Sequence, residues 1–261
     1  MLYNASRTKR SGSFIFMKKK ILKKLSGLIY PVRCPGCDGL LLGREKRPGF
    51  CVDCLEEVIY VREPYCKKCG KQLKDDRQYL CRDCETKHHY FTEARSVYVY
   101  RGCMMRAVYR FKYSNRRCYA DAFARDAVRL CGDWIRACGI SAVIPVPMYA
   151  KKKRKRGYNQ AEVFADRLAE GLGIPCDKRA VERTRSTRPQ KDLGIIERQI
   201  NLKNAFKCRG NVVQSLYEQK CVLVIDDIYT TGSTVDEIAR VLLEAGVARV
   251  YVLTLCSGTG I

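Results

Sequence analysis

The chain has 261 residues, of which 46% are hydrophobic and 30% charged, so it has room for one full-sized domain plus a small appendage and is too ordinary in composition to be disordered. Its 50 Lys and Arg residues against 27 Asp and Glu residues leave a net charge of +23, which favours polyanionic partners such as nucleic acid, phosphorylated small molecules or anionic lipid surfaces. No apolar run is long enough to span a membrane, and the basic N-terminal stretch lacks the apolar core of a secretory signal, so we expect a cytoplasmic protein.

The first 33 residues are predicted to be a basic extension that ends in a short helix. Residues 1–16 are polar and patternless, whereas Met17, an alternative start of the chain, opens a segment whose apolar residues recur at helical spacing up to Ile29. We expect this helix to pack its apolar stripe on the main domain. Peripheral contact of its basic face with a membrane or a partner is the alternative.

Residues 34–90 are rich in turns and cysteine and too poor in apolar runs to form a core of their own. Eight of the 16 cysteines of the chain fall here in four C-x-x-C pairs, a spacing that aims two thiols at one metal ion. The pairs form two quartets, each suited to one tetrahedral structural zinc: Cys34, Cys37, Cys51, Cys54 and Cys66, Cys69, Cys81, Cys84. Zinc would supply the folding energy that this segment lacks.

Several details of this double zinc module stay open at the level of sequence. Four redox-active or disulfide pairs would require four independent coincidences of spacing. The spacing does not distinguish consecutive from interleaved quartets, and His88 or His89 is an alternative ligand, although an exposed tandem of histidines is the simpler interpretation. Gly39 and Gly70 are expected to provide the unusual backbone angles that such turns need.

Strands and helices alternate over residues 91–261. Apolar runs predict strands at residues 95–101, 141–147, 179–183, 220–226 and 248–255, and amphipathic spacing predicts helices at residues 104–113, 119–137, 159–172, 195–204 and 231–245. Because strands that alternate with helices form parallel sheets, we expect an α/β domain with a mostly parallel sheet and helices on both faces.

The segment VLVIDDIYTTGST, residues 222–234, carries the most specific pattern of the chain. A buried strand delivers Asp226 and Asp227 to its C-terminal end, where open α/β sheets bind ligands. A small, hydroxyl-rich turn then opens the next helix, and its amides and hydroxyls are suited to cradle a phosphate. The turn consists of Thr230, Thr231, Gly232, Ser233 and Thr234.

This segment resembles the thirteen-residue signature of type I phosphoribosyltransferases. The resemblance implies that Asp226 and Asp227 bind the ribose of phosphoribosyl pyrophosphate, that the turn holds its 5-phosphate, and that magnesium accompanies the ligand. Such a site displaces pyrophosphate from the anomeric carbon without a protein nucleophile. Cationic contacts for the leaving group are sought in the basic run of residues 151–156; a solvated surface run or a contact with nucleic-acid phosphates are the alternatives.

Four features in this order are similar to the competence-associated ComF family: the zinc module, PVP followed by RGYNQ at residues 156–160, the segment at residues 187–206, and the phosphoribosyl turn. The family pattern places a mobile catalytic lid on the third of these, and Arg198 is its candidate lid residue; the other matching positions are Thr187, Gln190, Leu193 and Asn201. Capping and surface pairing are the alternative roles. The resemblance also implies work on single-stranded DNA together with the competence machinery.

Three functions therefore compete. The first is a magnesium-dependent transferase that uses phosphoribosyl pyrophosphate and an unknown acceptor. The second is a non-catalytic factor that binds phosphoribosyl pyrophosphate or a nucleotide as a signal during DNA handling. The third is a zinc-dependent nucleic-acid binder with a vestigial pocket. Basic and aromatic residues interleave between Tyr109 and Arg117, a pattern that suits base stacking and is explained as well by core packing.

Overall fold

The computed structural model describes residues 32–42, 49–185, 202, 204–209 and 220–259. The predicted N-terminal helix of residues 17–31 and the lid positions Thr187, Gln190, Leu193, Arg198 and Asn201 lie outside these residues, so they remain predictions. Within the described part, no helix is long and apolar enough to cross a membrane.

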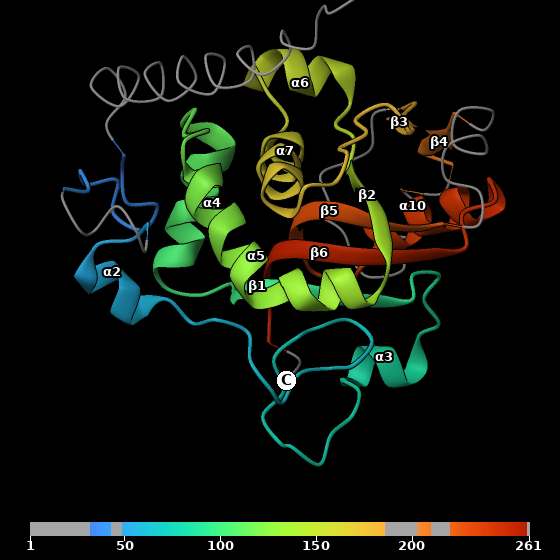
Figure 1. Cartoon of the computed structure of the whole chain (residues 1–261), viewed down its shortest axis with the longest axis horizontal. Coiled ribbons are helices and arrows are strands. Elements are labelled where there is room, and N and C mark those ends of the chain that lie inside the picture. The colour runs from blue at the N-terminus through green and yellow to red at the C-terminus, as the bar shows by residue number, and fades with distance from the viewer. Residues whose placement is uncertain (1–31, 43–48, 186–201, 203, 210–219, 260–261) are drawn as a thin grey trace, which may run out of the picture.

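The core of the molecule is a parallel sheet of four strands in the order β1-β6-β5-β2 (Figure 1). The strands are β1 Glu93–Val99, β2 Ile140–Pro145, β5 Cys221–Tyr229 and β6 Arg249–Ser257. The two central strands, β5 and β6, are buried along nearly their whole length because both faces of the sheet are covered. The predicted parallel α/β sheet is therefore confirmed.

Alternate residues of the central strands point to two separate hydrophobic cores. Leu223 and Ile225 pack on the face covered by α4 (Cys103–Tyr113), α5 (Tyr119–Ala137) and α7 (Gln160–Leu172). Val222 and Val224 pack on the opposite face, which is covered by α10 (Ser233–Glu244). The period of two in the strand thus assigns one core to each face, as expected for a sheet with helices on both sides.

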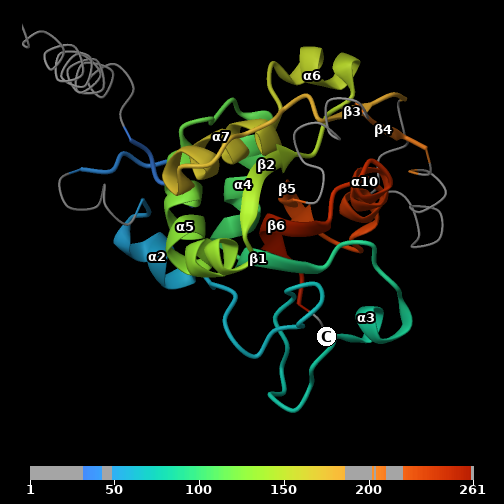
Figure 2. The same cartoon turned by 45° about the vertical axis from the view of Figure 1, so that its right-hand side comes forward.

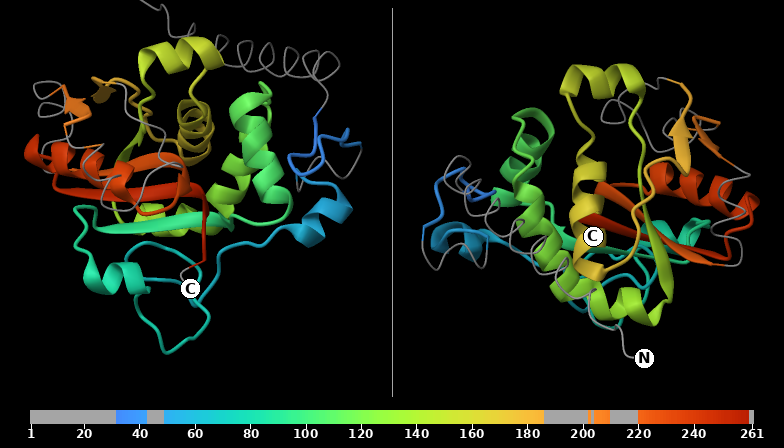
Figure 3. Two further views of the ribbon diagram at one scale, coloured as in Figure 1. Left: turned by 180° about the vertical axis from the view of Figure 1, so that it is seen from behind. Right: turned by 45° about the horizontal axis from the view of Figure 1, so that its top comes forward.

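The two cysteine modules lie on opposite faces of this sheet. The first cysteine module, residues 33–57 with α2 (Val52–Glu57), shares its core with α4, α5 and α7. The second cysteine module, residues 65–87 with α3 (Arg82–Thr86), shares its core with α10. Figures 2 and 3 show α2 beside the α4–α5 end of the molecule and α3 beyond β1. The segment between the modules runs antiparallel to β1, with Val61 N donating to Val97 O at 3.0 Å.

Four elements differ from the sequence prediction. The basic run forms a short helix, α6 (Ala150–Arg156), since Lys and Arg are good helix formers and Gly157, at φ +84°, ends it. Strand β3 (Val181–Arg183) pairs with an unpredicted antiparallel strand, β4 (Phe206–Cys208). Strand β5 continues to Tyr229, beyond the acidic pair, and α10 begins at Ser233 instead of Thr231.

Candidate functional site

Asp226 and Asp227 lie near the C-terminal end of β5, as the sequence predicted, and their environments differ. Asp227 is only 6% exposed, whereas Asp226 is partly open to solvent. The backbone N–H of Asp227 donates to Oδ1 of Asp226 at 2.8 Å. The two adjacent carboxyl groups thus lie at one edge of a covered sheet, where ionising both is unfavourable unless cations or donors lie nearby.

Two side chains satisfy the buried carboxylate of Asp227. Lys112, from α4, places its ammonium 2.9 Å from Oδ1, and Gln160, the first residue of α7, donates Nε2 to Oδ2 at 2.5 Å. Burial lowers the pKa of Lys112, but the attraction of Asp227 outweighs it and the pKa rises above its usual value. Lys112 is therefore a charged group within the site, and Asp227 is oriented before any ligand arrives.

Asp226 is the carboxyl group that remains available to a ligand. Burial and the negative charge of Asp227 raise its pKa to about 7, despite opposing contributions from Lys112 and Arg183. A group that titrates near neutrality gains or loses its proton easily as charge enters the site. Asp226 is thus suited to accept a hydrogen bond from a sugar hydroxyl or to bind a cation when ionised.

The predicted phosphate turn lies between β5 and α10. Gly232 adopts φ +73° as the N-cap of α10, and no side chain caps this helix, so the first-turn amides face the turn without a capping oxygen. A Cβ atom at Gly232 would lie 2.3 Å from the hydroxyl of Tyr229, so this position requires glycine for space as well as for backbone angle. The hydroxyls of Thr231 and Ser233 are 2.9 Å apart, while Thr230 is exposed.

Cations from two further elements, α6 and β3, lie close enough to the acidic pair to interact with it. Partial burial lowers the pKa of Lys152 in α6, and the neighbouring charges of Arg156, Arg183 and Lys112 lower it further, while Asp227 opposes them. Burial also lowers the pKa of Arg183 in β3, and Asp226 acts against that shift. Such mutual repulsion among cations is relieved when an anion binds between them.

The remaining basic residues of α6 divide between structural and solvent-facing roles. Lys153 forms an ion pair with Glu162 at 2.6 Å, and Arg156 donates to Gln160 at 2.5 Å while lying 4.7 Å over the ring of Tyr113. Four other residues have no ion pair among the described residues: Lys151, Lys152, Arg154 and Lys155. Most of this run is thus exposed, as the surface interpretation expected, while its contact with a leaving group or with nucleic-acid phosphates remains a prediction.

Each cysteine quartet converges within one module, so the quartets are consecutive and not interleaved. The four sulfurs of each quartet lie within 4.8 Å of one another, with Cys37 and Cys51 3.7 Å apart and Cys69 and Cys81 3.6 Å apart. Two thiolates bound to one tetrahedral zinc at about 2.3 Å are separated by about 3.8 Å. The side chains therefore fit one zinc ion per quartet, held by Cys34, Cys37, Cys51, Cys54 and by Cys66, Cys69, Cys81, Cys84.

Two expectations about this region are wrong. His89 is 3% exposed instead of solvent-facing, because its ring stacks on Phe91, while His88 is exposed as expected. Neither histidine belongs to a described metal cluster. Gly70 takes a positive φ of +71° after its cysteine pair, but in the first module Asp38, at φ +68°, takes that position in place of Gly39.

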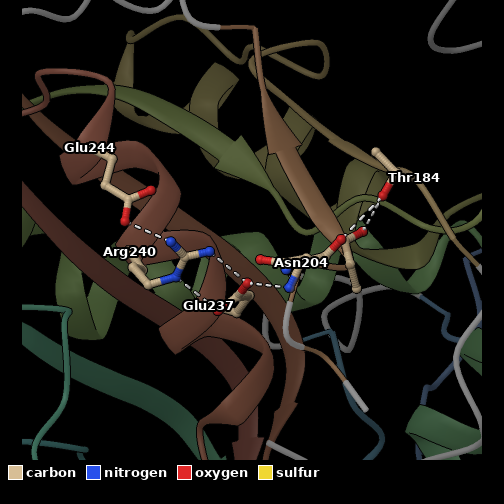
Figure 4. Close-up of polar contacts among 6 residues, drawn as sticks. Thr184, Asn204, Glu237, Arg240 and Glu244 are labelled. Carbon is tan, nitrogen blue, oxygen red and sulfur yellow. Dashed lines mark hydrogen bonds and ion pairs between the residues drawn. The ribbon is translucent and has the colours of Figure 1, made fainter. Parts of the chain in front are cut away.

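A separate hollow of about 600 Å³ lies between β4 and the outer face of α10. Its lining includes neither the acidic pair nor the phosphate turn. Arg240, which lines it, is paired with Glu237 at 2.8 Å and Glu244 at 2.6 Å, and Glu237 also accepts the backbone N–H of Asn204 at 2.9 Å (Figure 4). Because these charges neutralise one another, the hollow is a poorer candidate for an ionic ligand than the acidic pair.

Comparisons with known proteins agree with this geometry. A double zinc ribbon domain matches residues 25–85 and a phosphoribosyl transferase domain matches residues 159–259. The fold and the two sites thus define a phosphoribosyltransferase domain preceded by a double zinc ribbon. The first and second cysteine modules are its first and second zinc ribbons.

The family is shown by relatives that match most of the chain. Competence protein F of Haemophilus influenzae is 31% identical over 84% of this chain and 94% of its own length. The DNA utilization protein YhgH of Salmonella typhimurium is 32% identical over 80% of this chain and 90% of its own, and Competence protein ComFC of Bacillus subtilis is 26% identical over 76% and 79%. The chain belongs to the ComF family.

Three residues of the site were not assigned to it from the sequence, among them Arg183, which was placed only at the end of a predicted strand. Gln160 is the last residue of the RGYNQ motif, which indicated the family of the chain but not the contact of Gln160 with Asp227. Lys112 was noted only as part of a stretch in which basic and aromatic residues interleave. That stretch divides in the structure: Phe111 is fully buried, Lys112 enters the site, and Tyr109 and Tyr113 face solvent. The helical period of α4 separates the buried from the exposed positions of this stretch, since 108 and 111 are buried while 109 and 113 are exposed, but it does not identify the partner of Lys112.

Proposed function

We propose that the acidic pair and the phosphate turn bind phosphoribosyl pyrophosphate together with magnesium. The observation that supports this most directly is the juxtaposition at the end of β5: the partly open carboxyl of Asp226, the pre-oriented Asp227 and a turn whose Gly232 is packed too tightly for any side chain. Lys112, Lys152 and Arg183 supply positive charge close to the acids. A sugar that carries phosphates at both ends matches this distribution of acid and base.

Each part has a chemical role in this proposal. The turn and the first amides of α10 hold the 5-phosphate, since aligned N–H groups and a helix N-terminus favour an anion. Asp226 and Asp227 accept hydrogen bonds from the ribose hydroxyls, and Lys152 with Arg183 contact the pyrophosphate. The oxygen ligands of Asp226 and of the pyrophosphate suit magnesium, which would neutralise the leaving group when bound.

Transfer is the reaction that such a site is suited to perform. The bond between the anomeric carbon and the pyrophosphate oxygen breaks with its electron pair leaving on pyrophosphate, and the lone pair of an acceptor nitrogen forms the new bond before that nitrogen loses a proton to solvent. The cations that surround the leaving group stabilise its developing charge. The competing function is a signal-binding site of the same composition that releases no pyrophosphate.

Calorimetry with phosphoribosyl pyrophosphate and magnesium tests the binding. We expect one site per chain in the wild type and none in the Asp226→Ala/Asp227→Ala variant. If the wild type shows no heat of binding, both the transferase and the signal-binding function are refuted, and the nucleic-acid binder with a vestigial pocket is the remaining hypothesis. Pyrophosphate release over a panel of nitrogen bases and amines then separates transfer from signalling, because binding without release supports the non-catalytic function.

We also propose that this ligand serves DNA handling, and that single-stranded DNA contacts the outer face of α4 and α6. Tyr109 and Tyr113 lie one turn apart on α4, are each 61% exposed, and have ring centroids 5.1 Å apart. Arg156 covers the ring of Tyr113, and the solvent-facing lysines of α6 continue the positive charge. Aromatic platforms flanked by cations bind single strands without sequence preference. The relatives are named competence and DNA utilization proteins, which supports the same proposal.

The DNA surface is tested with a fluorescent oligothymidine. Tyr109→Ala/Tyr113→Ala should weaken binding by about tenfold or more, since each stacked base contributes about 1–3 kcal/mol. Tyr79→Ala is the matched control, because Tyr79 is 74% exposed on the second zinc ribbon. Equal effects of the two changes, or affinity independent of salt concentration, would contradict a phosphate-contacting surface at α4 and α6.

A further inference from the structure

We propose that the second zinc ribbon and the segment that follows it position the phosphate turn, through Lys87 and His89 respectively, so that the ribbon is a structural part of the ligand site. This inference rests on the proposed function for its consequence on binding, but the positioning itself stands on contacts within the chain. Three sets of contacts join the ribbon, and the segment that follows it, to the turn and to the first turn of α10.

The first contact is made by Lys87, the residue that follows α3. Its ammonium donates to the backbone carbonyl of Thr231 at 3.0 Å, across the boundary between ribbon and sheet domain. Burial lowers the pKa of Lys87, while Asp236 and Asp83 oppose that shift. Because this contact fixes a carbonyl in the middle of the turn, it would limit the orientations that the neighbouring amides can take toward a phosphate.

The second contact fixes Asp236, in the first turn of α10. Its carboxylate accepts the backbone N–H of Tyr90 at 2.7 Å and lies 3.2 Å from Nδ1 of His89. A carboxylate that accepts the Tyr90 amide is an acceptor, so we assign the His89 proton to Nδ1 as donor. The backbone N–H of Asp236 in turn donates to Gly232 O at 2.8 Å, which ties this anchored residue directly to the turn.

The third contact is the packing around Tyr229. Its buried ring meets Phe91 edge to face at a centroid distance of 6.2 Å, and the ammonium of Lys71, from the ribbon, lies 5.8 Å from its centroid. The same ring fills the space where Gly232 would carry a side chain. The wall of the turn is therefore a tyrosine whose other side is packed by the second zinc ribbon and by the strand leading to β1.

The presence of a histidine at position 89 is better explained by its contact with Asp236 than by a contribution to the stability of the fold. Its Nε2 is buried and has no hydrogen-bond partner in the described part of the molecule. A buried nitrogen without a partner costs free energy, and a phenyl ring would fill the same space without that cost. What the histidine adds over an apolar residue is the contact with Asp236, which fixes the first turn of α10.

Ligand-free hydrogen exchange of the amides of residues 230–236 tests the positioning directly, and calorimetry with magnesium and phosphoribosyl pyrophosphate tests its consequence. Lys87→Met and His89→Leu remove the contacts, while Lys87→Arg and His89→Asn retain a donor at a similar place. Lys67→Met is the matched control: this lysine of the same ribbon donates to Glu63 at 2.6 Å, and none of its described contacts reaches the turn or the residues packed on it.

We expect Lys87→Met and His89→Leu each to speed exchange in the turn and to weaken ligand binding by about tenfold, the equivalent of one charged hydrogen bond, with recovery in Lys87→Arg and His89→Asn. Lys67→Met should change neither quantity by more than about twofold. Unchanged exchange in Lys87→Met and His89→Leu, or an equal increase in Lys67→Met, would overturn the proposal. If the wild type binds no phosphoribosyl pyrophosphate while exchange behaves as expected, the proposed function fails and the positioning holds.

Discussion

Lys112→Met is the change that most directly tests how the acidic pair is stabilised. It keeps the length of the side chain but leaves the buried carboxylate of Asp227 without its cation. Two unit charges 2.9 Å apart attract each other by about 6 kcal/mol at an effective dielectric constant of about 20. Breaking a buried ion pair from one side costs about 3–5 kcal/mol. Because Gln160 still donates to Asp227, we expect the free energy of unfolding to fall by about 2–4 kcal/mol at pH 8.

Urea unfolding of the zinc-loaded protein at pH 8 and pH 5 provides the measurement. Without Lys112, a carboxyl group of the pair should retain a proton at higher pH, so the loss should be smaller at pH 5 than at pH 8. The double variant Lys112→Met/Asp227→Asn should be more stable than Lys112→Met alone at pH 8, because the unpaired charge is gone. Equal losses at the two pH values, or additive losses in the double variant, would refute the ion pair as the source of the effect.

Three further outcomes are expected. Folding raises the pKa of Asp226 to about 7, so its contribution to the stability of the folded chain is full below about pH 4 and is lost as the pH rises through 7. The same titration should strengthen binding of magnesium and phosphoribosyl pyrophosphate about tenfold from pH 6 to pH 8, as measured by calorimetry. Asp226→Asn should remove this pH dependence of binding. Gly232→Ala should abolish ligand binding because the new methyl group would clash with Tyr229. Gly173→Ala is the control: Gly173 has a similar φ of +71° but no atom within 4 Å of its Cβ position, so this change adds backbone strain without a clash and should leave binding unchanged. Elemental analysis should give two zinc ions per chain and one in Cys81→Ser; two ions in that variant would exclude its quartet as a site.

The sequence was sufficient for features governed by local pattern. The buried run of β5 and the helical spacing of α4, α5, α7 and α10 follow from periodicity, and the cysteine spacing predicted both quartets. The short strand β4 has no such pattern, because three residues carry too little periodic signal and its partner β3 is distant in sequence. The run of α6 has no apolar stripe at all, so its helix is supported by intrinsic propensity and by Gly157.

The parts of the site that were missed are tertiary pairings. Nothing in the neighbourhood of Lys112 marks it as the partner of Asp227, since the contact exists only once α4 is packed beside β5. The prediction for His89 was wrong for the same reason, since its burial also depends on tertiary packing. A tandem of histidines suggests exposure, yet this ring is covered because the chain passes between the second zinc ribbon and α10 before it enters β1. Residues that bridge separately folded segments are recognised from geometry and not from spacing.

The placement of the two zinc ribbons explains why residues from distant parts of the sequence meet at this site. The first ribbon holds α4, the helix that carries Lys112, because Arg110 donates to Gly36 O at 2.9 Å. The second ribbon contacts the phosphate turn through Lys87 and Thr231. Each zinc ribbon therefore contacts a different part of the same site from its own face of the sheet. Loss of either zinc should displace a different wall, so Cys51→Ser should act on the acidic pair and Cys81→Ser on the phosphate turn, which hydrogen exchange of β5 and of residues 230–236 would distinguish.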